Sequence, residues 1–158
     1  MPENLTISYE QPKPEELTED DASDVAELSK DLTPNNAIQT TRDSLATAAG
    51  QHHVLVARLV PEDSEKRRRI IGMGRLILSY SPATGRDAII ADVVVRKSGK
   101  WRGKNVGKRI SQLLVRAARE AGAHQVWLRS GEHRTAAHRL YESIGFKRKD
   151  SRIYVLNL

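Results

Sequence analysis

Three strand-like segments follow one another between residues 53 and 95, and this block constrains the fold more than any other part of the chain. They read HVLVARLV (53–60), IIGMGRLILSY (70–80) and AIIADVVV (88–95), and all three are rich in β-branched residues. Two polar connections, 61–69 and 81–87, separate them. Connections this short favour an antiparallel meander of three strands.

The next segment changes from strand to helical periodicity. Apolar residues recur at helical spacing over 106–121, Lys108 and Arg109 fall on the outer face, and Gly122 ends the pattern. The segment HQVWL (124–128) then reads as a buried strand that contains Trp127. A strand, a helix and a second strand in this order predict a parallel crossover.

Weaker signals predict the remaining elements and complete an α/β fold. The order is β-α-α-β-β-β-α-β-α-β, which gives a mixed, mostly antiparallel sheet flanked by helices in one domain over 1–158. The first helix buries a stripe that includes Ala22 and Val25, and the second buries Ile38 and Leu45. The remaining elements are strands at 5–10 and 152–158 and helices beginning at Thr18, at 36–50 and at 134–144.

Composition excludes several classes of function. The 158 residues contain no cysteine, so disulfides, thiolate nucleophiles and cysteine metal ligands are ruled out, and the five histidines form no ligand set. A single Phe argues against a stacking platform for single-stranded nucleic acid. We find no secretory signal and no apolar run near the ~20 residues that span a bilayer, so we expect a soluble, cytoplasmic protein without membrane contact.

The formal net charge of +6 favours an anionic partner. One basic run, KRRR (66–69), falls in a polar connection, where we expect a solvated turn. A second, WRGKNVGKRI (101–110), combines glycines with cations where a helix begins. Free backbone N–H groups and the helix dipole make such a helix start an anion site, and glycines let a phosphate approach the backbone. Its spacing does not fit a P-loop, and the glycines at 72 and 74 do not complete a dinucleotide fingerprint.

Two motifs in this half of the chain resemble those of the GCN5-related N-acetyltransferase (GNAT) family. Residues 102–107, RGKNVG, resemble the family's [QR]-x-x-G-x-[GA], with Asn105 where glycine is usual. Residues 139–146, RLYESIGF, resemble its L-Y-x-x-x-G-F, and ADVVV (91–95) resembles the strand before the loop. The resemblance implies a GNAT-like fold.

The resemblance also implies an acetyl-CoA site and no metal. The loop backbone and its cations would hold the pyrophosphate, and the preceding strand would pair with the pantetheine arm and line the thioester. Arg134 stands where the family often has Asn and would pair with a CoA phosphate. The implied CoA-binding residues are Val93, Val94, Val95, Arg102, Gly103, Lys104, Asn105, Val106, Gly107, Lys108 and Arg134.

By the same resemblance, Tyr141 would be the general acid that protonates the departing thiolate, although a lone tyrosine on a helix more often serves packing. Asp92 is the nearest carboxylate to the thioester strand and a candidate base acting through a water; a structural aspartate is the alternative, and the base stays open. The implied reaction is direct acetyl transfer, in a ternary complex, to a primary amine of a small molecule or peptide, by a protein that could form a homodimer. A non-catalytic acyl-CoA-binding protein and a small basic nucleic-acid-binding domain remain the alternatives.

Overall fold

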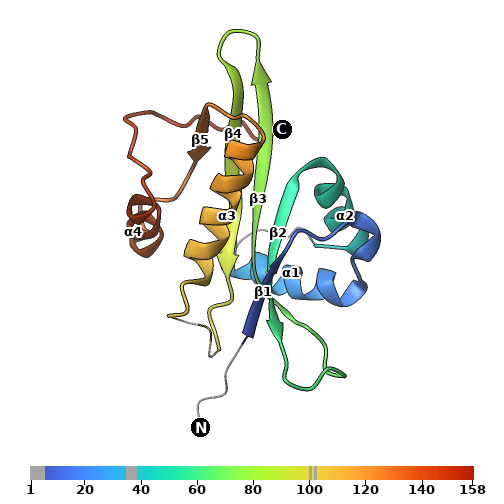
Figure 1. Ribbon diagram of the computed structural model, residues 1–158. Coiled ribbons are helices and arrows are strands. Elements are labelled where there is room, and N and C mark those ends of the chain that lie inside the picture. Colours follow the sequence, from blue (N-terminus) through green and yellow to red (C-terminus); the bar gives the residue numbers. More distant parts are fainter. Residues whose placement is uncertain (1–5, 35–38, 100, 102) are drawn as a thin grey trace.

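The computed structural model describes residues 6–34, 39–99, 101 and 103–158 (Figure 1). One five-stranded sheet runs through the centre, and helices lie on both sides of it. The elements are β1 (Thr6–Glu10), a 3-10 turn at Pro14–Glu16, α1 (Glu19–Leu32), α2 (Arg42–Gln51), β2 (His53–Val60), β3 (Ile70–Ser81), β4 (Gly85–Val95), α3 (Val106–Glu120), β5 (Gln125–Leu128) and α4 (Thr135–Ser143).

The sheet confirms the predicted meander and crossover. The strand order is β1-β2-β3-β4-β5, and every neighbouring pair is antiparallel except β4 and β5, which are parallel. The pairing of β4 with β5 ends at Ile90 and Leu128, while β4 continues to Val95. The second half of β4 therefore lacks β5 on that side.

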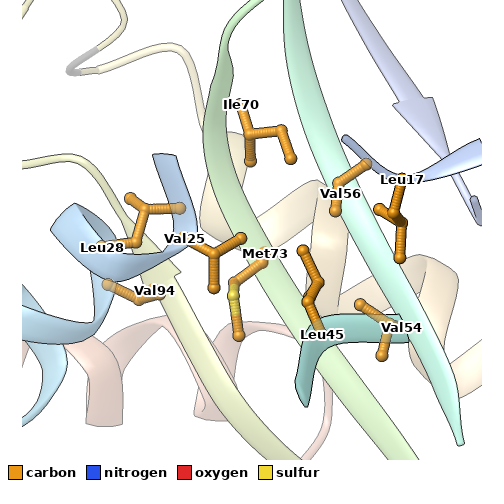
Figure 2. Packing of buried hydrophobic residues seen from close by; sticks show 9 residues of the cluster. All are labelled: Leu17, Val25, Leu28, Leu45, Val54, Val56, Ile70, Met73 and Val94. Carbon is orange, nitrogen blue, oxygen red and sulfur yellow. The ribbon is translucent and has the colours of Figure 1, made fainter. Parts of the chain in front are cut away.

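Each face of the sheet has its own apolar cluster. On one face, nine buried residues from α1, α2, β2, β3, β4 and the segment before α1 form one cluster (Figure 2). On the other face α3 packs through Ile110 and Leu114, both almost completely buried. Neighbouring strand residues such as Val56 and Ala57 belong to opposite clusters, as the alternation of side chains along a strand requires.

Both N-terminal helices bury the residues that their periodicity predicts, with two differences. Ala22, Val25 and Leu45 are buried as expected, but the most buried apolar residue of α1 is Leu28, which was not predicted. Helix α2 begins at Arg42 and not near residue 36, because Thr41 caps it by accepting a hydrogen bond from the Ser44 N–H at 3.1 Å. Ile38 lies outside the described residues.

The expected strand at 152–158 is wrong: the segment has no regular secondary structure, and its apolar side chains are exposed. The prediction that 124–128 is a buried strand is only half right. The strand exists, but Trp127 is 42% exposed and the Lys149 Nζ lies 5.9 Å from the centre of its ring. β5 pairs only with β4 among the described residues, so little of it is covered.

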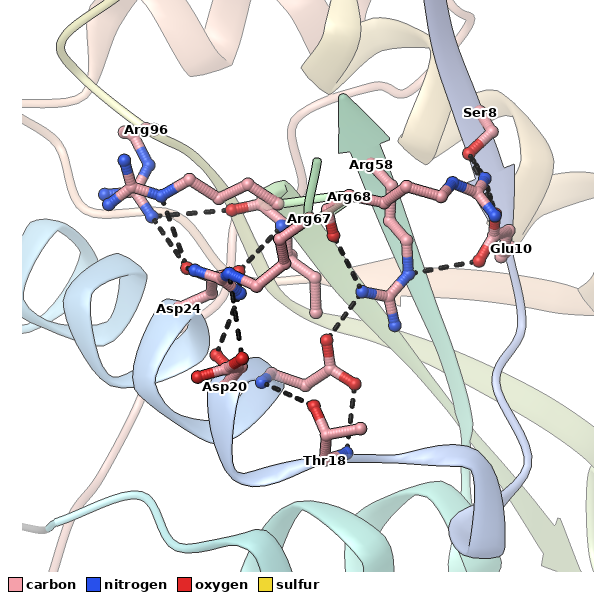
Figure 3. A network of polar contacts seen from close by, with 12 residues as sticks. Ser8, Glu10, Thr18, Asp20, Asp24, Arg58, Arg67, Arg68 and Arg96 are labelled. Atoms are coloured by element: carbon pink, nitrogen blue, oxygen red, sulfur yellow. Dashed lines mark hydrogen bonds and ion pairs between the residues drawn. The ribbon is translucent and has the colours of Figure 1, made fainter. Parts of the chain in front are cut away.

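The basic run at 66–69 is largely exposed, as expected, but its three arginines are also ion-paired. Arg67 and Arg69 both pair with Asp24 of α1, which is 2% exposed, and Arg68 pairs with Glu10 (Figure 3). The Asp24 carboxylate accepts from Arg67 at 2.7 and 2.9 Å and from the Ile70 N–H at 2.9 Å. This network ties the connection between β2 and β3 to α1.

The lowered pKa of Asp21, a second acidic residue of α1, predicts how the stability of the fold depends on pH. Burial alone would raise the pKa of Asp21, but hydrogen bonds from the Arg58 guanidinium at 2.6 Å and the Thr18 backbone N–H lower it below 3.8. A lowered folded-state pKa gives stability that is complete above the unfolded-state pKa and is lost as pH falls through the folded-state value. The free energy of unfolding in urea should therefore fall as the pH is lowered below about 5, through the folded-state pKa. In Asp21→Asn that fall should be smaller, and an equal fall in both proteins would contradict this assignment.

Candidate active site

The site begins at a pocket of about 500 Å³ between the end of β4, the start of α3 and one face of α4. Its α4 residues, Ala136, Leu140 and Ser143 among them, are spaced as one helix face. The complete lining is Val95, Arg96, Lys97, Trp101, Gly103, Asn105, Val106, Gly107, Lys108, Ala136, Arg139, Leu140 and Ser143.

The opening turn of α3 presents backbone donors to this pocket. The first helical hydrogen bond runs from the Arg109 N–H to the Asn105 carbonyl at 2.9 Å, so the N–H groups of 106–108 precede the helix ladder. Gly103 and Asn105 have φ values of 78° and 56°, and these left-handed residues make the bend that turns the loop into the helix. The Asn105 side chain makes no capping hydrogen bond and is exposed. The predicted anion site thus has the expected backbone geometry.

Two glycines of β3 bring α3 unusually close to the sheet. A Cβ on Gly74 would lie 2.8 Å from both Ile110 Cγ2 and Leu114 Cδ1, and one on Gly72 would lie 3.1 Å from Ile110 Cδ1. A side chain at Gly74 would force Ile110, Leu114 or the helix backbone to shift. From the sequence, Gly72 and Gly74 were considered only as part of a dinucleotide-binding motif. Two glycines in a strand that face the apolar stripe of a helix are the feature that indicates close packing of helix on sheet.

Arg96, the residue that follows β4, is bonded both to α1 and to the loop before α3. The Arg96 guanidinium pairs with Glu27 of α1, and its side chain is buried. Its carbonyl accepts a hydrogen bond from Trp101 Nε1 at 3.0 Å. Trp101 lines the pocket, so it holds the long connection after β4 against the strand. Arg96 and Trp101 position the pocket, and no motif identified Arg96.

The structure brings together only part of the predicted CoA-binding set. Val95, Gly103, Asn105, Val106, Gly107 and Lys108 line the pocket. Val93 packs in the cluster on the α3 face, Val94 in the cluster under α1, and Lys104 is exposed next to the loop. Arg102 lies outside the described residues.

Arg134 is not among the residues that line the pocket. Its guanidinium donates to the Leu32 carbonyl at 2.6 Å and so satisfies the C-terminal end of α1. This contact joins α4 to α1 across 102 residues of chain. The Arg134 guanidinium therefore links two helices, and a phosphate would have to compete with the Leu32 carbonyl for it.

Tyr141 lies on α4, beside the lining residue Leu140, and does not itself line the pocket. Its ring packs edge to face with Phe146 at a centroid distance of 5.9 Å. Burial raises the pKa of the Tyr141 phenol above 10.0, and the positive charge of Arg134 only partly opposes this. The phenol is therefore protonated at neutral pH and can act as a proton donor.

Asp92 occupies an irregular point of β4. Its φ is 56°, and its Oδ2 accepts a hydrogen bond from Arg75 Nε of β3 at 2.7 Å. It does not line the pocket. The Asp92 carboxylate is therefore engaged in an ion pair with Arg75.

Comparison with known proteins gives the family of the chain. The model of the acetyltransferase (GNAT) family matches residues 15–146. The chain belongs to that family. This N-acetyltransferase resembles the solved Trypanosoma brucei acetyltransferase at 25% identity and a TM-score of 0.67, over 98% of this chain and 100% of that one. No curated protein sequence matches the chain.

Two more distant structures share the fold of this GNAT acetyltransferase. Glucosamine-6-phosphate N-acetyltransferase from Arabidopsis thaliana is 20% identical with a TM-score of 0.68, over 96% of this chain and 98% of that one. An aminoglycoside N-acetyltransferase in complex with CoA is 14% identical with a TM-score of 0.69, over 99% of this chain and 98% of that one. Within the described residues there is no group of three or more acidic, His or Cys side chains that could hold a metal. None of the described helices is long and apolar enough to cross a membrane.

Proposed function

We propose that this GNAT acetyltransferase uses acetyl-CoA to acetylate a primary amine by direct transfer within a ternary complex. The observation that carries this proposal is that one pocket joins the N-terminal turn of α3 to the last residues of β4. The N-terminal turn of α3 can bind a diphosphate, and the end of β4 can hold an extended acyl arm. The two ends of one cofactor, acetyl-CoA, would therefore both be bound in this pocket.

The diphosphate would lie against the N–H groups of 106–108. The helix dipole adds partial positive charge there, and Lys108 at the pocket wall adds a full one. Lys104 and Arg102 stand beside the loop in the sequence and would extend the cationic rim. We expect phosphate groups to supply most of the cofactor's electrostatic attraction.

The pantetheine arm would run along β4 beyond Ile90, where β5 no longer pairs with it. An extended chain can add to such an open strand edge through backbone hydrogen bonds. We assign Val93, Val94 and Val95 to this edge, and a backbone N–H near Val95 to the thioester carbonyl. A well-placed donor to the developing oxyanion contributes roughly 3–4 kcal/mol.

In the transfer step the amine nitrogen attacks the thioester carbonyl carbon and the carbon–sulfur bond breaks. The departing sulfur takes the proton of the Tyr141 hydroxyl, and the attacking nitrogen loses one proton to solvent or to a base. Solvent then returns a proton to Tyr141. Because the chain has no cysteine, no acyl-cysteine intermediate can form.

The acceptor is expected among small-molecule and peptide amines. Structures similar to this one include a glucosamine-6-phosphate N-acetyltransferase, an aminoglycoside N-acetyltransferase and the NatC complex bound to a peptide and CoA. These names span amino sugars and peptide amines, so an acceptor panel should contain both.

The deciding experiment is a calorimetric titration with acetyl-CoA followed by free-thiol release. The panel would hold an amino-sugar phosphate, an aminoglycoside, a lysine-containing peptide and a peptide with a free N-terminus. We expect saturation at one acetyl-CoA per chain and amine-dependent thiol release. Saturable binding without release from any amine would favour a non-catalytic acyl-CoA-binding protein, and no binding would remove the proposal.

Asn105 offers a test of the loop alone. Asn105→Gly should keep acetyl-CoA affinity within about threefold, because glycine adopts the same left-handed backbone. Asn105→Val should weaken affinity at least about tenfold, because a β-branched residue is a genuine outlier at positive φ and the N–H groups of 106–108 would move. The measurement is the calorimetric Kd, with circular dichroism as a check of folding. Equal affinities in the two variants would show that the bend at 105 does not shape the site.

A further inference from the structure

The most irregular backbone in the sheet lies at Asp92. Asp92 and Asn105 are the non-glycine residues with positive φ among those described, and only Asp92 sits inside a strand. A left-handed residue inside a strand interrupts its pleat. Aspartate and asparagine tolerate this conformation better than other side chains do.

The register of β3 against β4 shows what Asp92 does there. Met73 pairs with Val94 and Arg75 pairs with Ala91, so Gly74 alone lies opposite Asp92 and Val93. Two residues opposite one make a β-bulge, which bends the strand and turns its side chains and backbone groups to new directions. The bulge begins two residues after Ile90, the last residue of β4 that pairs with β5.

A side-chain contact spans this bulge. Arg75 follows Gly74 in β3 and pairs with Ala91, next to the bulge. Its Nε donates to Asp92 Oδ2 at 2.7 Å. Both side chains are partly buried, at 28% and 36% exposed. On the opposite face Gly74 leaves room for Ile110 and Leu114 of α3. The bulge is thus held by an ion pair on one face and by a close helix contact on the other.

We propose that Asp92 and Arg75 are positioning residues that fix the β4 bulge, and that Asp92 serves through its left-handed backbone and its ion pair and not as the general base. The bulge sets the direction of Val93 to Val95, the residues assigned to the thioester. This inference rests on the proposed function, since the benefit of the positioning is the placement of the acyl group.

The test compares variants of the full chain that all lack the carboxylate. Asp92→Gly keeps the left-handed backbone, Asp92→Asn keeps both that preference and a hydrogen-bond acceptor, and Asp92→Ala keeps neither. With acetyl-CoA and the amine that the wild type acetylates fastest, kcat of the Asn variant, which keeps an acceptor for Arg75, should stay within about threefold of wild type, and kcat of the Gly variant, which loses the ion pair, should fall only several-fold. For the Ala variant it should fall about tenfold or more, because small misplacements of reacting groups are costly.

The pH profile separates this role from proton abstraction. If Asp92 is a positioning residue, the acidic limb of kcat/KM keeps its midpoint in the Gly and Asn variants. If Asp92 is the base, all three variants lose activity by the same large factor and the acidic limb disappears, which would overturn the proposal. Three variants with wild-type activity would overturn it as well, because the bulge would then not matter.

The role of Arg75 is tested by a double-mutant cycle with Asp92. Arg75→Met should lower kcat several-fold in the wild-type background and change it little in Asp92→Gly, since the two residues act on the same bulge. Arg75→Lys should restore part of the loss. Equal losses from Arg75→Met in the two backgrounds would contradict a shared role.

A structural readout keeps the inference independent of catalysis. The amide chemical shifts of Val93 to Val95 should be nearly unchanged in Asp92→Asn and displaced in Asp92→Ala. If wild-type protein acetylates no amine, the proposed function fails while these shifts still test the bulge. Unchanged shifts in Asp92→Ala would overturn the positioning role in either case.

Discussion

Tyr141→Phe should lower kcat about 100-fold, because a well-placed general acid contributes at least that factor. The substitution removes only the hydroxyl, so the edge-to-face packing on Phe146 is retained. The Kd for acetyl-CoA should change less than about threefold, since the phenol is assigned to the departing sulfur and not to the ground state. Thiol release at saturating acetyl-CoA measures the first quantity and calorimetry the second.

The pH dependence of this effect follows from the pKa of the phenol. Burial raises the pKa of Tyr141 above 10.0 despite the nearby Arg134 charge, so the proton is present throughout the neutral and mildly alkaline range. Activity should therefore show no loss attributable to Tyr141 until the pH exceeds 10.0. The difference between wild type and Tyr141→Phe should stay constant below that pH.

Tyr80→Phe is the matched control, because Tyr80 is exposed near the tip of the hairpin between β3 and β4. It removes the same atom and should leave kcat unchanged. Tyr141→Phe with wild-type turnover would remove the proton-donor assignment. A parallel loss of acetyl-CoA affinity and of thermal stability would indicate a packing role instead.

Asp24→Ala should lower the free energy of unfolding by about 3–5 kcal/mol, the usual cost of removing one partner of a buried ion pair. The Asp24 carboxylate accepts from Arg67 and from the backbone N–H of Ile70, and Arg96, itself buried, lies 3.8 Å away. Without the carboxylate, the Ile70 N–H and the Arg96 guanidinium lose a partner in a place that water reaches poorly. Urea denaturation of both proteins at neutral pH measures the difference.

The same variant tests a link between this network and the active site. Arg96 follows β4 and lines the pocket, so a loosened Arg96 should also weaken acetyl-CoA binding. Asp43→Ala is the control, since Asp43 pairs with Arg42 at 3.6 Å in an exposed position and its removal should cost no more than about 0.5 kcal/mol. An Asp24→Ala loss as small as that of Asp43→Ala would mean that the buried network contributes no net stability.

Sequence alone determined the parts of this protein that depend on local chemistry. Alternating β-branched residues and short polar connections gave the meander of β2, β3 and β4, and the period of α3 gave its buried face. Glycines and cations before Val106 predicted a helix start able to bind an anion, and residues 106–108 of that start line a pocket in the structure. These features could be predicted because each depends on residues that are close to one another in the sequence.

Only the tertiary structure decided which distant groups meet. The arginines at 67–69 look like a solvated turn until the fold places Asp24 more than 40 residues earlier in the chain against two of them. The guanidinium of Arg134 donates to the carbonyl of Leu32, which lies 102 residues earlier in the chain. Segment 152–158 has a strand composition, yet it forms no strand because a strand exists only through hydrogen bonds to a neighbour. Periodicity reports what a segment prefers, while pairing partners are chosen by the free energy of the whole packed chain.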